Sequence, residues 1–281
     1  MKYAFVTGVS SGIGKSTAEK FLKEGFYVFG SVRKPEHAEA FKNQYAERFH
    51  PLIFDITDFE AVDKAVSEIR DILQDNILDV FVNNAGVAKY GPIQHVPIEE
   101  LRQQFEVNVF ANVNLTQKVL PLIGASKTAK KKGKLFVISS TAGIMTRPML
   151  GPYSASKHAI EAIYDALRRE MMIYGIDVII IEPGPIKTDI WGKAKKGGNP
   201  YEDTAYGKIF AQLDDAVDQI EKIGLPVNKV SDKIWAAYQS KKPKARYIVT
   251  PKKFQFIMAM YVLPAKKLDK IFFKEFKNLI K

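Results

Sequence analysis

Short apolar runs alternate with longer stretches of helical periodicity over most of the chain. The runs are rich in β-branched and aromatic residues and almost continuously apolar, as expected for parallel strands that are buried on both faces. The strands expected on this basis are residues 3–7, 26–32, 52–54, 80–82, 135–139, 178–181 and 246–250. The pattern predicts an α/β protein, a doubly wound Rossmann fold whose parallel sheet of about seven strands carries helices on both faces.

A single domain accounts for residues 1–250. The sequence shows no internal repeat and no linker between domains, and a last domain helix is expected at residues 232–241. Glycines and a proline at 197–200 lie in a segment, about 185–225, that we expect to form a flap over a substrate. Residues 251–281 are expected to form a basic, amphipathic C-terminal extension.

The composition narrows the classes of chemistry. Hydrophobic residues make up 46% of the chain and charged residues 26%, which is typical of an ordinary globular protein. The 281 residues include no cysteine, which excludes disulfides, thiolate metal sites and cysteine nucleophiles. The four histidines, His37, His50, His95 and His158, are scattered, so we expect no metal site.

The formal net charge of +11 is concentrated towards the C-terminus. From Lys252 to Lys281 there are eight lysines and two acidic residues, Asp269 and Glu275. Elsewhere the lysines are typical of a solvated surface, and we expect no nucleic-acid partner. No signal peptide precedes the first expected strand and no apolar run reaches the length of a membrane span. These features predict a cytoplasmic protein, with peripheral membrane contact as a further expectation.

The first expected strand runs directly into a glycine-rich turn and a helix. Gly8, Gly12 and Gly14 remove side chains where the backbone turns tightly and meets a pyrophosphate. The N-terminus of the helix offers N–H groups and a positive dipole end to such an anion. Glycine triplets also occur in ordinary strand-to-helix turns, but a position after the first strand of a βαβ series favours a dinucleotide site.

The end of the second expected strand indicates which dinucleotide binds. Folds that prefer NAD place an acidic residue there to bond the ribose 2′-hydroxyl, whereas this chain has Val32 followed by Arg33. A guanidinium grips a 2′-phosphate with two hydrogen bonds, which favours NADP(H); the alternative is an arginine solvated in a loop. Asp55, after the third strand, is suited either to bond the adenine amino group or to cap a helix ahead of Asp58.

Tyr153 and Lys157 lie four positions apart in an expected helix and therefore share one face. An ammonium favours a neighbouring phenolate, so we expect Lys157 to lower the pKa of Tyr153 into the range of a catalytic acid and base. Ser139 and Ser140 close the preceding strand, where a hydroxyl is suited to bond the developing oxyanion. Only one of the two serines is able to face the substrate, and the alternative for either is capping of the strand end.

The same spacing recurs at Tyr238 and Lys242, so spacing alone does not identify a catalytic pair. This second pair lies at the end of an expected helix before Pro243. No hydroxyl on a preceding strand accompanies it, and we interpret it as part of the surface.

Four motifs, in order, resemble the classical short-chain dehydrogenase/reductase family over residues 2–250. They are Thr7-Gly8 with Gly12-Ile13-Gly14, Asn83-Asn84-Ala85-Gly86, Ser140 with Tyr153 and Lys157, and Pro183-Gly184. The three residues between Gly8 and Gly12 match the classical type, and Ser11 with Arg33 resembles its NADP-preferring members. Four ordered matches make a chance resemblance a poor explanation.

The resemblance implies a role for individual residues. Ser140 would orient the substrate, Tyr153 would be the catalytic acid and base, and Lys157 would also bond the nicotinamide ribose. Asn108 would bend a helix and hold a water beside the lysine, and Thr188 would bond the nicotinamide carboxamide. The residues expected to contact the cofactor are Gly8, Ser10, Ser11, Gly12, Ile13, Gly14, Arg33, Asp55, Asn84, Ala85, Gly86, Tyr153, Lys157, Pro183, Gly184, Ile186 and Thr188.

The expected flap is rich in apolar and aromatic residues. They are Ile190, Trp191, Tyr201, Tyr206, Ile209 and Phe210. Such residues either line a pocket for a lipophilic carbonyl or alcohol, or anchor the flap to the body of the protein, and the sequence leaves both open.

The C-terminal extension carries an apolar stripe at helical spacing, surrounded by lysines. The stripe is Leu268, Phe272, Phe276 and Leu279, and the lysines are Lys266, Lys267, Lys270, Lys274 and Lys277. This pattern is typical of an interfacial helix attracted to anionic lipid, and retinol- and steroid-type members of the family are similar in having membrane-associating additions. The alternative is a stripe that packs on its own domain or on a second subunit.

Together these features predict an NADP(H)-dependent oxidoreductase that interconverts a carbonyl and an alcohol, on a lipophilic small molecule, by hydride transfer. The resemblance also implies a homo-dimer or homo-tetramer. Two other functions stay open, a non-catalytic NADP-binding sensor and a scaffold at a membrane surface. The presence of both Tyr153 and Lys157 argues against the sensor.

Overall fold

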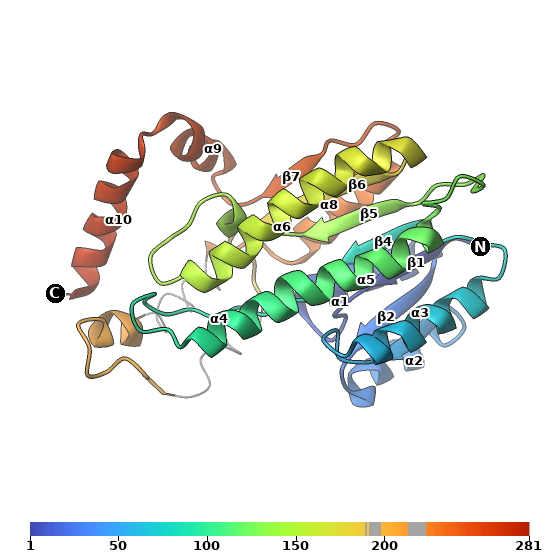
Figure 1. The fold of residues 1–281 in the computed structure, drawn as a ribbon, viewed down its shortest axis with the longest axis horizontal. Coiled ribbons are helices and arrows are strands. Elements are labelled where there is room, and N and C mark those ends of the chain that lie inside the picture. Colours follow the sequence, from blue (N-terminus) through green and yellow to red (C-terminus); the bar gives the residue numbers. More distant parts are fainter. Residues whose placement is uncertain (189, 191–197, 213–222, 281) are drawn as a thin grey trace.

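Seven parallel strands form one sheet in the computed structural model, which describes residues 1–188, 190, 198–212 and 223–280 (Figure 1). Their order across the sheet is β3-β2-β1-β4-β5-β6-β7. The strands are β1 (Tyr3–Val6), β2 (Tyr27–Val32), β3 (Phe49–Ile53), β4 (Val80–Asn83), β5 (Lys134–Ile138), β6 (Asp177–Pro183) and β7 (Arg246–Val249). The doubly wound Rossmann fold expected from the sequence is confirmed.

Helices cover both faces of the sheet (Figure 1). One face carries α1 (Gly12–Lys23), α2 (Glu39–Tyr45) and α8 (Asn228–Gln239), and the other carries α3 (Phe59–Leu73), α5 (Asn112–Val119) and α6 (Gly151–Glu170). A π-helix, Glu106–Ala111, joins α4 (Ile98–Phe105) to α5. Short 3₁₀ turns occupy Pro35–Ala38, Leu120–Ile123, Thr141–Gly143 and Met171–Tyr174.

The strands β1 to β6 each contribute to two separate apolar cores. On β1, Phe5 faces the α3, α5 and α6 layer, where its ring stacks on Phe81 with 5.1 Å between centroids. The flanking Ala4 and Val6 face the layer of α1 and α8 instead, and all three side chains are fully buried. Alternate positions of a strand point to opposite faces, so a strand covered on both sides needs apolar residues throughout. This is why the strands appear in the sequence as unbroken apolar runs.

Most strand ends differ from those expected by one or two residues, and two elements begin three or four residues earlier. The third strand begins at Phe49, three residues before the expected start, and includes Pro51. A proline is tolerated there because β3 is an edge strand of the sheet. The helix expected at 232–241 spans Asn228–Gln239, since the buried Val230 and Ile234 tie its first turns to the core.

The C-terminal extension forms two helices, α9 (Lys253–Val262) and α10 (Ala265–Ile280), which extend from one end of the molecule (Figure 1). Pro264 separates them, in keeping with the missing N–H of proline. Within the described part of the chain, none of the helices combines the length and the apolar character that a membrane span requires.

Candidate functional site

A cleft of about 780 Å³ lies at the carboxyl ends of the strands. The strand order reverses between β1 and β4, and open α/β sheets bind ligands at such a switch point. Seventeen of the nineteen residues expected at the site line the cleft: Gly8, Ser10, Ser11, Gly12, Ile13, Arg33, Asp55, Asn84, Ala85, Gly86, Ser140, Tyr153, Lys157, Pro183, Gly184, Ile186 and Thr188. The other two, Gly14 and Asn108, lie behind its walls.

The turn after β1 approaches the cleft with glycine backbone that other residues rarely adopt. Gly8 has φ of +70° and Gly12 has φ of +59°, both in the left-handed region. A Cβ on Gly12 would lie 3.4 Å from the methyl group of Thr188, which reaches the turn from the segment after β6. The first N–H groups of α1 have no acceptor within the helix and border the cleft, so this end fits the pyrophosphate of a dinucleotide.

Gly14 has a different role from the one expected. It is buried in α1, and a Cβ there would collide with the carbonyl oxygen of Gly8 and the amide of Asn84. The absence of a side chain therefore lets the helix pack against the turn, which places the first turn of α1 beside the cleft. Gly14 is not among the residues that line the cleft.

The segment after β2 presents Arg33 to the cleft, exposed to solvent, whereas the preceding Val32 is buried. His37, which the sequence did not single out, lines the same part of the cleft. The exposed guanidinium of Arg33 is suited to a phosphate on the adenosine ribose.

Asp55 does not cap α3, which was one of the two roles that the sequence left open. Its Oδ1 accepts hydrogen bonds from the backbone N–H and the hydroxyl of Thr57, at 3.0 and 2.7 Å, and so shapes the turn before α3. The cap of α3 is Asp58, which accepts from the N–H of Ala61 at 3.0 Å. Asp55 still borders the cleft and remains able to meet an adenine there.

Thr7 joins the two central strands at the floor of the cleft, a role that the sequence did not reveal. Its Oγ1 accepts from the backbone N–H groups of Asn84 and Ala85, both at 2.8 Å. The amide of Asn84 returns a hydrogen bond to the carbonyl of Thr7 at 2.8 Å. The next side chain, Asn83, is buried and donates to the carbonyl of Asn112 at 3.0 Å, which ties β4 to α5.

Asn108 sits inside the π-helix, where the helical chain bends. Its side chain makes a pair of 2.9 Å hydrogen bonds with the backbone N–H and carbonyl of Val87. The same amide donates to the hydroxyl of Ser156 at 3.1 Å, and Ser156 donates to the carbonyl of Tyr153 at 2.7 Å. Asn108 thus holds the loop after β4 against α6 rather than facing the cleft.

Tyr153 and Lys157 project from the first turns of α6 into the cleft, and each is 6% exposed. Lys157 Nζ donates to the carbonyl of Ile138 at 2.8 Å and lies 5.8 Å from the centroid of the Tyr153 ring. The Ser140 hydroxyl accepts from the N–H of Ala142 at 3.1 Å. The end of β5 and the first turns of α6 therefore bring a hydroxyl, a phenol and an ammonium to one end of the cleft.

The electrostatics of the pair differ from the expectation. Burial raises the pKa of Tyr153, and a hydrogen bond with Ser140 offsets this only in part, so the predicted lowering by Lys157 is wrong for the protein alone. Burial lowers the pKa of Lys157 to about 8, against the opposing charge of Glu161. Burial therefore favours the neutral form of both groups, and for the lysine the cost of removing a cation from water outweighs the attraction of its nearby anion.

Ser139 and Ser140 both border the cleft but face different partners. Ser140 bonds the phenol of Tyr153, as its position in the motif implies. Ser139 approaches Gly143 and the carboxylate of Glu161. Ser140 is therefore the serine placed to meet a substrate oxygen.

The second pair with the same spacing does not form. Tyr238 lies in α8, while Lys242 follows the end of that helix and is exposed. The Tyr238 ring instead meets Lys2 and Lys134, whose Nζ atoms lie 5.3 and 5.9 Å from its centroid. These residues are at the amino ends of the strands, away from the cleft, so the interpretation as surface agrees with the structure.

The far end of the cleft is walled by aromatic side chains from the flap. Phe210 stacks on Tyr90 with 5.4 Å between centroids and meets Tyr201 edge-on at 4.8 Å. Tyr201 and Ile209 are 5% and 2% exposed, so these residues anchor the flap, and Ile190, Tyr201 and Phe210 line the cleft as well. The two roles weighed from the sequence coexist. Trp191 lies outside the described residues.

Comparison with known proteins agrees with this geometry. Residues 2–198 match the family model described as short chain dehydrogenase. A protein of Ornithobacterium rhinotracheale named NADPH-dependent 3-dehydrocapnine reductase is 70% identical over 99% of both chains. The uncharacterized oxidoreductase YbbO of Escherichia coli is 34% identical over 96% of this chain and 93% of its own. The crystal structure of a short-chain dehydrogenase from Streptomyces avermitilis superposes with a TM-score of 0.76 at 28% identity, over 96% of this chain and 93% of that one.

Proposed function

Because the chain belongs to the short-chain dehydrogenase family, we propose that it is an NADPH-dependent reductase that converts the ketone of a lipophilic substrate to an alcohol. The proposal depends on one observation: Tyr153, Lys157 and Ser140 lie together at one end of the cleft. The remainder of the same cleft, lined by the glycine turn and Arg33, fits a dinucleotide. A non-catalytic sensor would not need this meeting, so that alternative is not favoured.

The dinucleotide arm supports NADP(H) as the cofactor. The turn of Gly8 and Gly12 would receive the pyrophosphate, and Arg33 would bond the 2′-phosphate that distinguishes NADP from NAD. Near the reacting end, Thr188 would bond the carboxamide and Lys157 the ribose hydroxyls. When bound, NADPH supplies the hydride that reduces the carbonyl carbon.

Tyr153 would deliver the proton that completes the alcohol. Its hydroxyl donates to the carbonyl oxygen as negative charge develops there, and Ser140 donates a second hydrogen bond to the same oxygen. The phenolate that remains is stabilised by the ammonium of Lys157. Two electrons and one proton arrive as hydride at carbon, and a second proton arrives at oxygen, so the reduction balances.

The substrate we propose is 3-dehydrocapnine or a closely similar ketone. Support comes from the 70% identity, over nearly the full length of both chains, with the reductase that bears that name. The aromatic wall of Tyr90, Tyr201 and Phe210 suits an apolar part of the substrate. Lys89 and Glu100 are the charged residues described at that end of the cleft, and they are suited to polar groups of the same molecule.

We also propose that the C-terminal extension rests on an anionic lipid surface. Phe254, Met258 and Val262 recur every fourth residue on α9 and are 74%, 41% and 60% exposed. Seven described lysines flank them, Lys252, Lys253, Lys266, Lys267, Lys270, Lys274 and Lys277. An exposed apolar face next to lysine-rich sequence complements anionic headgroups.

The apolar stripe of α10 behaves differently. Phe272 packs under Arg147, with 5.7 Å between the guanidinium carbon and the ring centroid, so part of this helix docks on its own domain. The side chains of Phe276 and Leu279 lie outside the described residues. A cytoplasmic location, the division at residue 250 and assembly as a homo-dimer or homo-tetramer stay predictions.

Tyr153→Phe removes the proposed proton donor and keeps the ring. We expect kcat for ketone reduction to fall by a factor of about 10² to 10⁴, while NADPH binding, followed by its fluorescence, is retained. Tyr238→Phe, at the other tyrosine with the same spacing, is the control and should keep full turnover. Substantial turnover in Tyr153→Phe would refute the assignment of Tyr153 as the acid.

Arg33→Asp replaces the proposed phosphate ligand with a charge that repels the phosphate. We expect KM for NADPH to rise by about 10- to 100-fold, the range of one or two lost charge-assisted hydrogen bonds, with little change for NADH. Lys34→Asp makes the same charge change at the next residue, which is exposed and outside the described cleft lining. An equal effect of both variants on the NADPH to NADH ratio would contradict a specific contact by Arg33.

A triple change of Phe254, Met258 and Val262 to serine tests the lipid surface. The unaltered protein should co-sediment with phosphatidylglycerol vesicles at low salt and much less at high salt or with phosphatidylcholine. The triple variant should lose this binding and keep reduction of a water-soluble ketone. Ile173→Ser, at an apolar residue 79% exposed outside the extension, should bind as before. Equal binding by the triple variant would reject α9 as the contact.

A further inference from the structure

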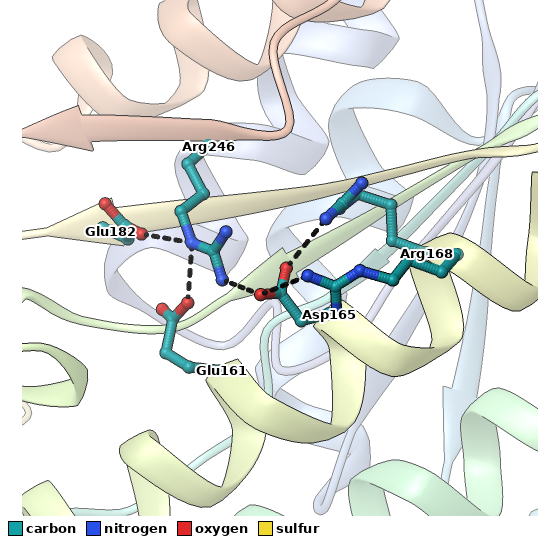
Figure 2. A network of polar contacts seen from close by, with 6 residues as sticks. Glu161, Asp165, Arg168, Glu182 and Arg246 are labelled. Carbon is teal, nitrogen blue, oxygen red and sulfur yellow. Dashed lines mark hydrogen bonds and ion pairs between the residues drawn. The ribbon is translucent and has the colours of Figure 1, made fainter.

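Three acidic side chains, Glu161, Asp165 and Glu182, surround Arg246 (Figure 2). Arg246 on β7 places Nε 3.1 Å from Glu161 Oε2 and 3.2 Å from Glu182 Oε1, and its Nη2 2.9 Å from Asp165 Oδ2. Glu161 and Asp165 project from α6 and Glu182 from β6. The cluster therefore joins the catalytic helix to two neighbouring strands.

The three acidic partners of Arg246 differ in their other contacts and in the direction or size of their pKa shifts. Asp165 also meets Arg168 at 3.3 Å, and although burial opposes its charge, Arg246 and Arg168 hold the pKa of Asp165 below its usual value. Glu182 is fully buried, and within the described part of the chain neither of its carboxylate oxygens accepts a hydrogen bond. Burial and the nearby charge of Glu161 raise the pKa of Glu182 to about 7.

The distribution of protons in the cluster follows from these surroundings. Two carboxylates that share one guanidinium repel each other, and the one that is more deeply buried takes up a proton first. The Glu161 side chain is 11% exposed and hydrogen-bonded to Arg246, whereas Glu182 has only the ion pair. Burial raises the pKa of Glu161 as well, but hydrogen bonds with Ser139 and Arg246 and the charge of Arg246 oppose this. We therefore assign the proton of the pair to Glu182 and the negative charge to Glu161.

Glu161 lies one helical turn beyond Lys157 on the same face of α6. Burial is the largest influence on the Lys157 ammonium, and the charge of Glu161 is the influence that opposes it. On the other elements, Lys157 faces the carbonyl of Ile138, and its own helix adds the phenol of Tyr153. Glu161 is the only anion that acts on this lysine among the described residues.

Charged and polar groups from several elements surround Glu161 and Glu182. Glu161 faces Ser139 at the end of β5, Arg246 on β7 and Asp165 on its own helix. Glu182 faces Glu161, Arg246 and Asp165, and Lys253 at the start of α9. The charges of Arg246 and Lys253 act against the repulsion between the acids, so the cluster can hold a single anionic glutamate beside α6.

We propose that Glu161 is a positioning residue for the reaction: its carboxylate, held by Arg246, keeps the Lys157 ammonium charged and so sets the upper pH limit for proton delivery by Tyr153. This inference rests on the proposed function, because it assigns Lys157 the stabilisation of the Tyr153 phenolate. Glu161 touches neither the cleft nor a reacting atom and acts through Lys157 alone.

The direction of the pH effect follows from the charge of the lysine. Ketone reduction needs the protonated Lys157, so activity falls as pH rises through its pKa, which lies at about 8. The Glu161 anion raises that pKa, and its removal lowers it. Loss of the anion must therefore move the alkaline limb of the activity profile to lower pH.

The test compares the pH dependence of kcat/KM for ketone reduction in the wild type and in Glu161→Gln. We expect the alkaline limb to move to lower pH by about one unit, the shift typical of one nearby charge. Glu161→Asp keeps the charge and should restore most of the limb, whereas Glu170→Gln, at the exposed end of α6, should leave it in place. An unmoved limb in Glu161→Gln would overturn the proposal.

Glu182→Gln is a second variant, which tests the proposal independently if Glu161→Gln does not fold. A neutral amide resembles the protonated carboxyl that we assign to Glu182, so the alkaline limb should stay where it is in the wild type. A limb displaced to lower pH in Glu182→Gln would make Glu182 the anion and overturn the assignment to Glu161. Thermal unfolding and NADPH binding verify that each variant is folded.

The two proposals fail in different ways. Retained turnover in Tyr153→Phe would remove the proposed function and this inference together. An inactive Tyr153→Phe with an unmoved limb in Glu161→Gln would leave the reductase assignment intact and reject only the role of Glu161.

Discussion

The arrangement depends on one buried cation. Lys157 holds its ammonium inside the protein by donating to the carbonyl of Ile138, at the end of a central strand, 5.8 Å from the ring of Tyr153. Removing an ammonium from water is unfavourable, so the position persists only where fixed oxygens and a nearby anion compensate. The strand end provides the first and Glu161 the second. The phenol, the hydroxyl of Ser140 and the cleft are placed relative to this charge.

The surrounding fold fixes the position of the Lys157 ammonium relative to the part of the cleft that is proposed to bind the dinucleotide. Thr7 links the strands on either side of the switch point, and Asn108 fastens the loop after β4 to α6. Gly14 allows α1 to pack against the turn that borders the same cleft. These contacts involve no ligand of the proposed reaction. They hold the dinucleotide part of the cleft and the end with Tyr153 and Lys157 at a fixed separation.

Much of the fold and of the cleft lining could be predicted from the sequence, because both follow local patterns. Apolar runs mark the strands, and the glycine turn and the Tyr153–Lys157 spacing sit at strand and helix ends. The predictions that differ from the structure concern properties that depend on tertiary contacts. The pKa of Tyr153 is governed by burial, and Gly14 is set by a contact with Gly8 that composition does not reveal. The Arg246 cluster joins residues up to 85 positions apart, so no sequence window contains it.

The titration of Lys157 itself tests the account most directly. Protein carrying isotope-labelled lysine, with the Lys157 signal assigned by its loss in Lys157→Arg, would be followed by NMR as pH rises, without nucleotide. The account predicts a midpoint at about 8. A midpoint at the ordinary lysine value of about 10.4 would contradict it, because the ammonium would then be solvated and not held inside the cleft.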